Sequence, residues 1–414
     1  MQSKVPIRTL PSGVAGMDEV LGGGFPEFSL NLIVGGPGTG KTTLGQQIMF
    51  ANAEPTRKAL YFTVIGEPPL KMLRYMQQMA FFDPVKVDQS IRFIHLGEEA
   101  REGGLEKVLA RIIHEVDQCD PALVVVDSFR SVMRRAHAAD SGEVAVQDFT
   151  QRLALHLTSC EATTFLLGEY ADNESENAVF TVADGIIWLL QDVERNSIVR
   201  KLKVQKMRGR AQIPGLQTMR LTERGITVFP RIPVPEQTSS AQSPLDRRLR
   251  TGVVELDEML GGGIPQGYSV LVAGPSGSGK TMLSSRFIEE GIQNGEPGVI
   301  AVFEKRPSDY LHTTSHGRAF GRLIDEQKLA IVYVRPLDLS IDETLTAIRD
   351  AVVRIGAKRV VIDSISGLEL ALAATFRDDF RESLYRMVGA LTGMGVTVMS
   401  TVEVADAFTV LQFS

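Results

Sequence analysis

Short runs of β-branched and other apolar residues alternate along the chain with longer stretches of helical, amphipathic spacing. In the first half the apolar runs are 30–34, 60–64, 91–95, 123–127 and 163–167, and helical patterns occupy 41–53, 104–118 and 143–159. In the second half the runs are 268–273, 298–303, 329–334 and 359–363. Continuous apolar runs separated by helices are typical of parallel strands buried on both faces. The pattern predicts an α/β fold, with a mostly parallel sheet flanked by helices in each half.

An internal repeat relates the two halves. Residues 13–42 read GVAGMDEVLGGGFPEFSLNLIVGGPGTGKT, and residues 252–281 read GVVELDEMLGGGIPQGYSVLVAGPSGSGKT. One register holds through the whole segment, so the chain contains two copies of one structural unit. We predict a first module at 1–230 and a second at 248–414, joined by a Pro-, Ser- and Gln-rich linker at 231–247. An ordered loop inside one domain is the alternative reading of that linker.

Composition and charge narrow the class of protein. The 414 residues are 43% hydrophobic and 23% charged, with a formal net charge of -6, so no overall basic field would attract nucleic acid or acidic membranes. The N-terminus lacks an apolar leader, and no apolar run is long enough to cross a bilayer. We therefore expect a cytoplasmic protein without a membrane partner. We read the surroundings of Cys119 and Cys160 as lacking a metal-ligating partner, and expect neither a disulfide scaffold nor a zinc site.

Both repeats contain the phosphate-loop pattern G-x-x-x-x-G-K-[ST], between an apolar run and a helical pattern. The residues expected to contact nucleotide are Gly36, Pro37, Gly38, Thr39, Gly40, Lys41, Thr42 and Thr43 in the first loop, and Gly274, Ser276, Gly277, Ser278, Gly279, Lys280, Thr281 and Met282 in the second. Glycines let backbone N–H groups turn toward phosphate oxygens at a helix N-terminus. A Gly-rich turn without a ligand is the alternative, but the strand-loop-helix context and the duplication favour ATP binding.

Magnesium is expected beside each phosphate loop. Thr42 and Thr281 would each supply a hydroxyl, and Asp127 and Asp363, which end apolar runs, would each supply a carboxylate. An Asp that ends a strand can instead cap a helix. The predicted cofactors are thus ATP and Mg²⁺.

Together these motifs resemble the KaiC family of RecA-superfamily ATPases, a family that includes a circadian clock protein. The resemblance rests on the segment before each phosphate loop, the D-S after each acidic strand, and the sequence K-M-R-G at 206–209, and it covers nearly the whole chain. It implies two tandem RecA-like modules in a homohexamer with ATP between subunits, slow hydrolysis, serine/threonine autokinase activity and regulatory protein partners. It also implies that Lys206 and Arg208 reach a neighbour's nucleotide; a solvated basic strand is the alternative.

The sequence departs from the family pattern in two places. Family members carry two adjacent acids after the second strand, whereas here each module retains one, so Glu67 and Glu304 are the candidate catalytic bases, beside Lys41 and Lys280. Glu304 precedes Lys305 and Arg306 and could instead be ion-paired. The second repeat also stops before a counterpart of the K-M-R-G strand, so we expect a second module whose distal part is missing, through truncation or loss.

Three functions fit these features. The leading one is an ATPase whose nucleotide state switches a ring, and the missing acids keep open an ATP-gated scaffold with vestigial hydrolysis. The third is a RecA-like DNA-binding ATPase, against which stand the negative net charge and the scarcity of aromatic residues beside basic pairs such as Arg134 and Arg135.

Overall fold

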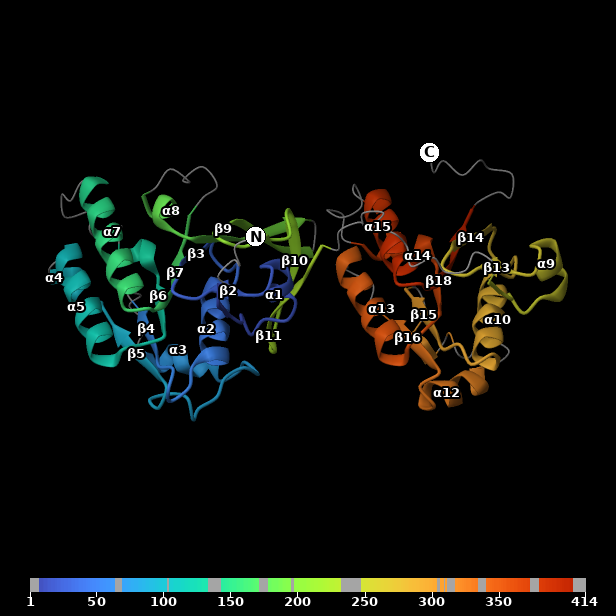
Figure 1. Ribbon diagram of the computed structural model, residues 1–414, viewed down its shortest axis with the longest axis horizontal. Coiled ribbons are helices and arrows are strands. Elements are labelled where there is room, and N and C mark those ends of the chain that lie inside the picture. Colours follow the sequence, from blue (N-terminus) through green and yellow to red (C-terminus); the bar gives the residue numbers. More distant parts are fainter. Residues whose placement is uncertain are drawn as a thin grey trace, which may run out of the picture. The chain divides into compact units, whose positions relative to one another are not determined.

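We describe the protein from a computed structural model, drawn in Figure 1. The structure describes residues 7–63, 69–102, 104–132, 143–170, 178–194, 197–231, 247–303, 306–308, 310, 317–333, 340–372 and 380–404. They divide into two compact units, the first within Met1–Asp192 and Val199–Arg231 and the second within Val193–Ile198 and Ile232–Ser414. Apart from its two end residues, the predicted linker at 231–247 lies outside the described residues. Among the helices described, none is long and apolar enough to span a membrane.

Five parallel strands form the core of the first unit. They are β3 (Leu30–Gly35), β4 (Ala59–Thr63), β5 (Ile91–His95), β6 (Leu123–Asp127) and β7 (Thr163–Gly168), in the order β3-β7-β6-β4-β5. Val124 and Val126 point into one hydrophobic core and Val125 into the other, and all three are fully buried. Because both faces of the sheet are covered, residues pointing to either face of these strands are mostly apolar. The predicted strands agree with the observed ones to within one residue.

Four further strands extend this sheet beyond β3. These are β8 (Gly185–Glu194), parallel to β3, followed by β9 (Ser197–Met207), β10 (Leu216–Thr222) and β11 (Gly225–Phe229), of which β10 pairs antiparallel with both neighbours. The result is one nine-stranded sheet. A separate two-stranded ribbon joins β1 (Thr9–Leu10) to β2 (Phe25–Pro26).

Helices cover both faces of the first sheet (Figure 1). On one face α5 (Gly104–Cys119), α7 (Glu143–Ser159) and α8 (Ala178–Val182) pack over one core; on the other, α1 (Met17–Val20), α2 (Lys41–Asn52) and α3 (Pro69–Met76) pack over the second. The short α4 (Glu99–Glu102) contacts α5. The helices predicted at 41–53, 104–118 and 143–159 are confirmed.

The second unit repeats the parallel half of the first. Its strands β14 (Ser269–Gly274), β15 (Gly298–Val302), β16 (Leu329–Tyr333), β17 (Arg359–Asp363) and β18 (Thr397–Glu403) are all parallel, in the order β14-β18-β17-β15-β16. The ribbon of β12 (Arg248–Leu249) and β13 (Ile264–Pro265) matches that of β1 and β2. The helices are α9 (Val254–Met259), α10 (Lys280–Gln293), α12 (Gly317–Asp325), α13 (Ile341–Ile355), α14 (Ile365–Ala371) and α15 (Phe380–Gly393). The two units are thus tandem RecA-like domains.

The units differ beside the strand that leads to each phosphate loop. In the described part of the second unit no strands correspond to β8–β11, and β14 is an edge strand. Tyr268 and Leu271 are therefore 52% and 44% exposed, whereas every residue of β3 is buried.

Candidate functional site

The loop between β3 and α2 has the geometry of a phosphate cradle. Gly38 and Gly40 have φ values of 73° and 103°, in the left-handed region that glycine adopts without strain. A Cβ atom at Gly36 or Gly38 would meet no atom within 4 Å, so the backbone there borders open space. Helix α2 starts at Lys41, and the first N–H groups of a helix have no acceptor within it. The loop can therefore hold a phosphate at the positive end of the helix dipole.

The Lys41 ammonium lies at this loop. It donates hydrogen bonds to the carbonyl oxygens of Gly35 and Gly36 at 2.9 and 2.6 Å, and the residue is only 8% exposed. Burial lowers the pKa of Lys41, and the carboxylates of Glu169 and Asp127 act in the opposite direction. A buried cation beside open loop backbone suits an anionic ligand that adds negative charge.

Asp127, at the end of β6, receives two hydrogen bonds. The hydroxyls of Thr42 and Tyr61 each donate to its Oδ2 at 2.7 Å. Burial raises the pKa of Asp127, while the bonds from Tyr61 and Thr42 lower it. The Thr42 hydroxyl and the Asp127 carboxylate are hard oxygen donors within direct contact of each other, as the predicted Mg²⁺ position requires. Tyr61 was missed by the sequence reasoning, because only the pairing of β4 with β6 brings it to Asp127.

In the first module, Mg²⁺-dependent nucleotide binding is expected to be lost as the pH falls. Tyr61→Phe is expected to move this loss to a higher pH. The variant removes a bond that lowers the pKa of Asp127, so the carboxyl takes up its proton at a higher pH. Magnesium needs the ionised form, and its binding is lost as the pH falls through that pKa. Titration of Mg-ATP affinity against pH measures the shift, with exposed Tyr75→Phe as the control. Identical profiles for Tyr61→Phe and the parent chain would contradict the coupling.

A pocket of about 530 Å³ adjoins the first phosphate loop. Loop residues line one side, and Arg130, Glu169, Tyr170 and Trp188 line the other. The Arg130 guanidinium lies 4.9 Å from the centre of the Tyr170 ring and donates to the backbone carbonyl of Glu169. This volume is in the range of small-ligand sites. The sequence reasoning also missed Glu169, although the second unit has an acid, Glu403, at the equivalent position.

The second phosphate loop repeats the lysine and threonine contacts of the first. Lys280 donates to the carbonyl oxygens of Gly274 and Pro275 at 2.8 and 2.7 Å, and the Thr281 hydroxyl donates to Oδ2 of Asp363 at 2.9 Å. Asp363 ends β17, the counterpart of β6. The structure thus brings together the lysine, threonine and aspartate that the sequence predicted for each module.

The remaining predicted loop residues flank these contacts. The Thr39 hydroxyl donates to the Gly36 carbonyl at 2.9 Å, and Gly277 and Gly279 have left-handed φ values of 78° and 91°. Thr43 is half-buried in α2, and Met282 of α10 is exposed. Pro37 lines the first pocket, and Ser276 and Ser278 are exposed in the second loop.

Lys206 and Arg208 lie at the opposite end of the sheet from the first phosphate loop. The Arg208 guanidinium pairs with Asp184 at 2.9 Å, and the same carboxylate accepts the N–H of Leu30, the first residue of β3. The loop begins at Gly35, the last residue of β3, about 16 Å away at the usual rise of a strand. The structure therefore does not bring these two basic residues to the phosphate loop of their own module.

The two candidate bases, Glu67 and Glu304, lie outside the described residues.

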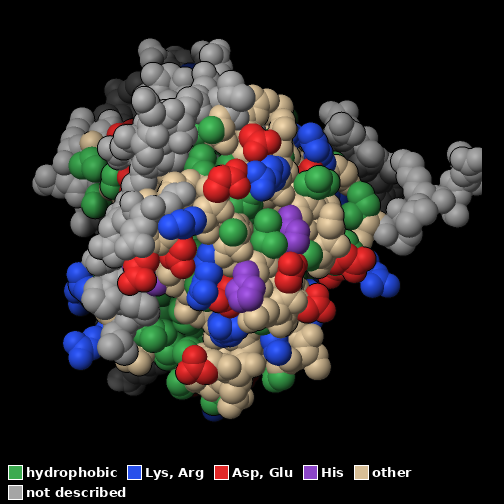
Figure 2. All heavy atoms as spheres, turned by 90° about the vertical axis from the view of Figure 1, so that its left-hand side faces the viewer, with side chains coloured by type: hydrophobic (Ala, Val, Ile, Leu, Met, Phe, Trp, Pro, Cys, Tyr) green, Lys and Arg blue, Asp and Glu red, His purple; other side chains and the backbone are tan. Residues whose placement is uncertain are grey.

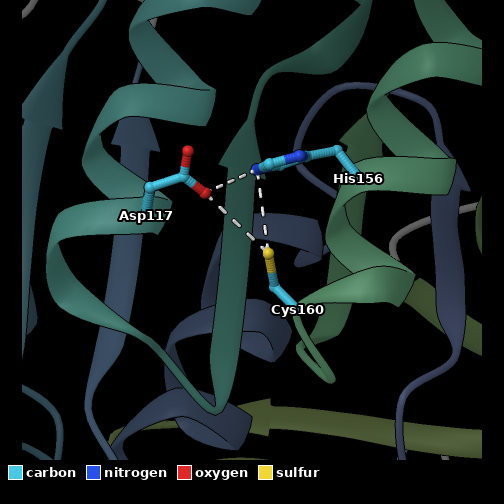
Figure 3. Close-up of side chains that lie close together, drawn as sticks. All are labelled: Asp117, His156 and Cys160. Atoms are coloured by element: carbon cyan, nitrogen blue, oxygen red, sulfur yellow. Dashed lines mark hydrogen bonds and ion pairs between the residues drawn. The ribbon is translucent and has the colours of Figure 1, made fainter.

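The expectation that no possible metal ligand lies near Cys160 is wrong. His156 precedes it by one helical turn, and the structure adds Asp117 from α5, so that the ligand atoms of Asp117, His156 and Cys160 lie within 4.8 Å of one another (Figure 3). The signal in the sequence was the four-residue spacing of His and Cys, which places both side chains on one face of a helix. Both cysteines are free thiols.

Comparison with known proteins bears on both modules. The family model described as "ATPase: KaiC" matches residues 10–232 and 249–412. The Circadian clock oscillator protein KaiC of Prochlorococcus marinus subsp. pastoris is 28% identical over 377 residues, which cover 88% of this chain and 72% of that protein. The protein of the same name from Thermostichus vulcanus is 27% identical over 381 residues, 89% of this chain and 71% of its own length.

Proposed function

We propose that this chain, which belongs to the KaiC family of ATPases, binds Mg-ATP in both modules and hydrolyses it slowly in a homohexameric ring whose state follows the bound nucleotide. One observation carries the proposal: each module places a lysine amine at a glycine-lined loop and a Thr–Asp pair beside it, at 2.7 Å in the first module and 2.9 Å in the second. A loop of this kind serves phosphate binding, and the pair serves magnesium.

In this proposal each side chain has a separate task. Lys41 and Lys280 offset the charge of the phosphates, and the helix N-terminus and loop N–H groups orient them. Thr42 with Asp127, and Thr281 with Asp363, would hold Mg²⁺, which when bound neutralises charge on the phosphates. Glu67 would orient the attacking water in the first module, and Glu304 in the second.

Lys206 and Arg208 would act on the nucleotide of a neighbouring copy. Their place at the far end of the sheet from their own loop supports a role between subunits, since a head-to-tail ring brings opposite ends of adjacent copies together. The Arg208 side chain is 60% exposed on this end and so is accessible to a neighbour. Such a cation stabilises the charge that develops on the transferred phosphate.

Arg208→Ala is expected to lower ATP turnover on the order of 10²-fold, because removal of one transition-state donor has an effect of this size. The sharper test mixes Arg208→Ala with Lys41→Ala chains. If Arg208 acts between subunits, about a quarter of the first-module sites in mixed rings combine an intact loop with an intact arginine, and activity recovers. Phosphate release measures it, with Arg210→Ala as the control. A mixture no more active than its components would place Arg208 outside the neighbour's site.

One measurement separates the remaining functions: the size of the purified chain with and without Mg-ATP, with phosphate release followed in the same samples. Assembly with slow release supports the switch, and Glu67→Gln should then reduce the release. Assembly without release selects the ATP-gated scaffold, the second candidate, which the single retained acid in each module favours.

Autophosphorylation on serine or threonine is tested by labelled phosphate retained on the chain. Salt-dependent binding of single-stranded DNA would support the RecA-like DNA-binding alternative.

A further inference from the structure

A second cluster of chemically active side chains lies on the helical face of the first unit, apart from the nucleotide site. Figure 2 shows this face, where acidic, basic and His side chains lie among hydrophobic ones. Oδ1 of Asp117 on α5 is 2.9 Å from Nε2 of His156 on α7, and Sγ of Cys160, just after α7, is 3.7 Å from the same nitrogen and 4.0 Å from the same oxygen. We propose that Asp117, His156 and Cys160 form a binding site for a thiophilic divalent metal ion, with Zn²⁺ as the best fit.

The three ligand atoms have nearly the spacing that zinc needs. With zinc–sulfur bonds of about 2.3 Å and zinc–nitrogen or zinc–oxygen bonds of about 2.05 Å, tetrahedral coordination separates sulfur from nitrogen or oxygen by about 3.5 Å, and nitrogen from oxygen by about 3.4 Å. The observed separations of 3.7, 4.0 and 2.9 Å differ from these by about half an ångström or less. Shifts of about half an ångström or less in the ligand atoms would bring them to that spacing.

The arrangement is that of a ligand set rather than of a catalytic Cys–His–Asp triad. In a triad the two ring nitrogens have different partners, one facing the nucleophile and the other the acid. Here a single nitrogen, Nε2 of His156, faces both the Cys160 sulfur and the Asp117 oxygen (Figure 3). It cannot accept a proton from the thiol while donating one to the carboxylate. All three atoms can instead direct their electron pairs at one ion.

The surroundings hold the ligands in place and leave one position open. Val116 and Leu157, the neighbours of Asp117 and His156 in the chain, are 1% exposed in the hydrophobic core, which fixes both helices. The Cys160 side chain packs against the same core. The Asp117 side chain is 54% exposed and that of His156 25%, so an ion and a fourth ligand such as water can enter from solvent. Asp120 lies close enough for its charge to act on Cys160 and adds negative charge that favours a cation.

The test measures metal binding by the nucleotide-free full chain in excess Mg²⁺, using Zn²⁺ in competition with a chromogenic chelator and Co²⁺ by absorption. The parent chain should bind one Zn²⁺ at this site and show a thiolate-to-cobalt charge-transfer band. Cys160→Ser should lose that band, and His156→Gln or Asp117→Asn should weaken Zn²⁺ binding at least tenfold, the lower end of what even outer-shell substitutions cost.

Cys119→Ser is the matched control, because Cys119 is the other half-buried free cysteine and lies outside the cluster. It should keep both the band and the affinity. A cobalt complex without a thiolate band, or Zn²⁺ affinity unchanged in both Cys160→Ser and Asp117→Asn, overturns the proposal. Asp117 is largely exposed, so its variant keeps the test informative even if the Cys160 variant folds poorly.

Discussion

Replacing Lys41 with alanine is expected to weaken Mg-ATP binding at the first module on the order of 10²-fold or more. Charge-assisted hydrogen bonds contribute about 1.5–3 kcal/mol each, and an ammonium at this loop can make two with phosphate oxygens. In the structure the amine already makes two bonds there, to the carbonyl oxygens of Gly35 and Gly36. The variant frees those carbonyls at the edge of a pocket, where water can replace the amine, so the fold should persist.

Calorimetric titration of the full chain with Mg-ATP measures this effect. The parent chain should show two tight sites, and Lys41→Ala and Lys280→Ala one each, because the loops belong to different units. Lys86→Ala is the matched control: its amine also donates to a backbone carbonyl, that of Phe50 at 2.7 Å, but at the other end of α2. A variant that combines Lys41→Ala with Lys280→Ala should show no tight site. Two tight sites in that double variant would remove the basis for assigning either loop to phosphate.

The sequence predicted those parts of the fold and site that depend on neighbours in the chain. Buried parallel strands consist mostly of apolar residues, so the limits of runs such as 123–127 predicted where the strands begin and end. The phosphate loops were predicted from the spacing of their glycines. Contributions from across the sheet could not be read. Tyr61 meets Asp127 only because β4 pairs with β6, and Glu169 lies at the loop only because β7 pairs with β3.

The same distinction applies to the cluster of Asp117, His156 and Cys160 and to the position of Arg208. His156 and Cys160 are four residues apart, a signal present in the sequence, whereas Asp117 comes from another helix and joins them only through the packing of α5 against α7. The pairing of Arg208 with Asp184 likewise depends on where β9 ends in the sheet, directly before Arg208.

The buried position of Arg359 in the second unit could not be predicted, since the run 359–363 resembles any buried strand. Its side chain is 2% exposed, pairs with Glu296 at 2.8 Å and donates to the carbonyl oxygens of Arg250 and Phe287 at 2.7 Å each. Its guanidinium also lies 4.6 Å from the centre of the Phe287 ring. At the same strand position the first unit has Leu123, so the fold itself does not require a cation there.

Arg359→Leu is therefore expected to destabilise the second unit by about 3–5 kcal/mol, the usual result of removing one partner of a buried ion pair. The variant leaves the Glu296 carboxylate buried and paired with the exposed Arg247 at 2.7 Å, and leaves two carbonyls without the guanidinium. A loss of this size should lower the unfolding temperature of a unit of this length by about 10 °C. The first unit, which has its own core, should keep its stability.

Hydrogen exchange resolved by peptide separates the two units and measures the change in each. Arg247→Ala is the matched control: it removes the exposed partner of the same carboxylate and should cost at most about 1 kcal/mol, as for other surface pairs. Arg359→Leu combined with Glu296→Leu should recover part of the loss, because no buried charge is then left uncompensated. Equal losses of stability in Arg359→Leu and Arg247→Ala would show that the buried contacts of Arg359 contribute no more than a surface ion pair. The stability of the second unit would then come from its apolar residues rather than from this buried pair.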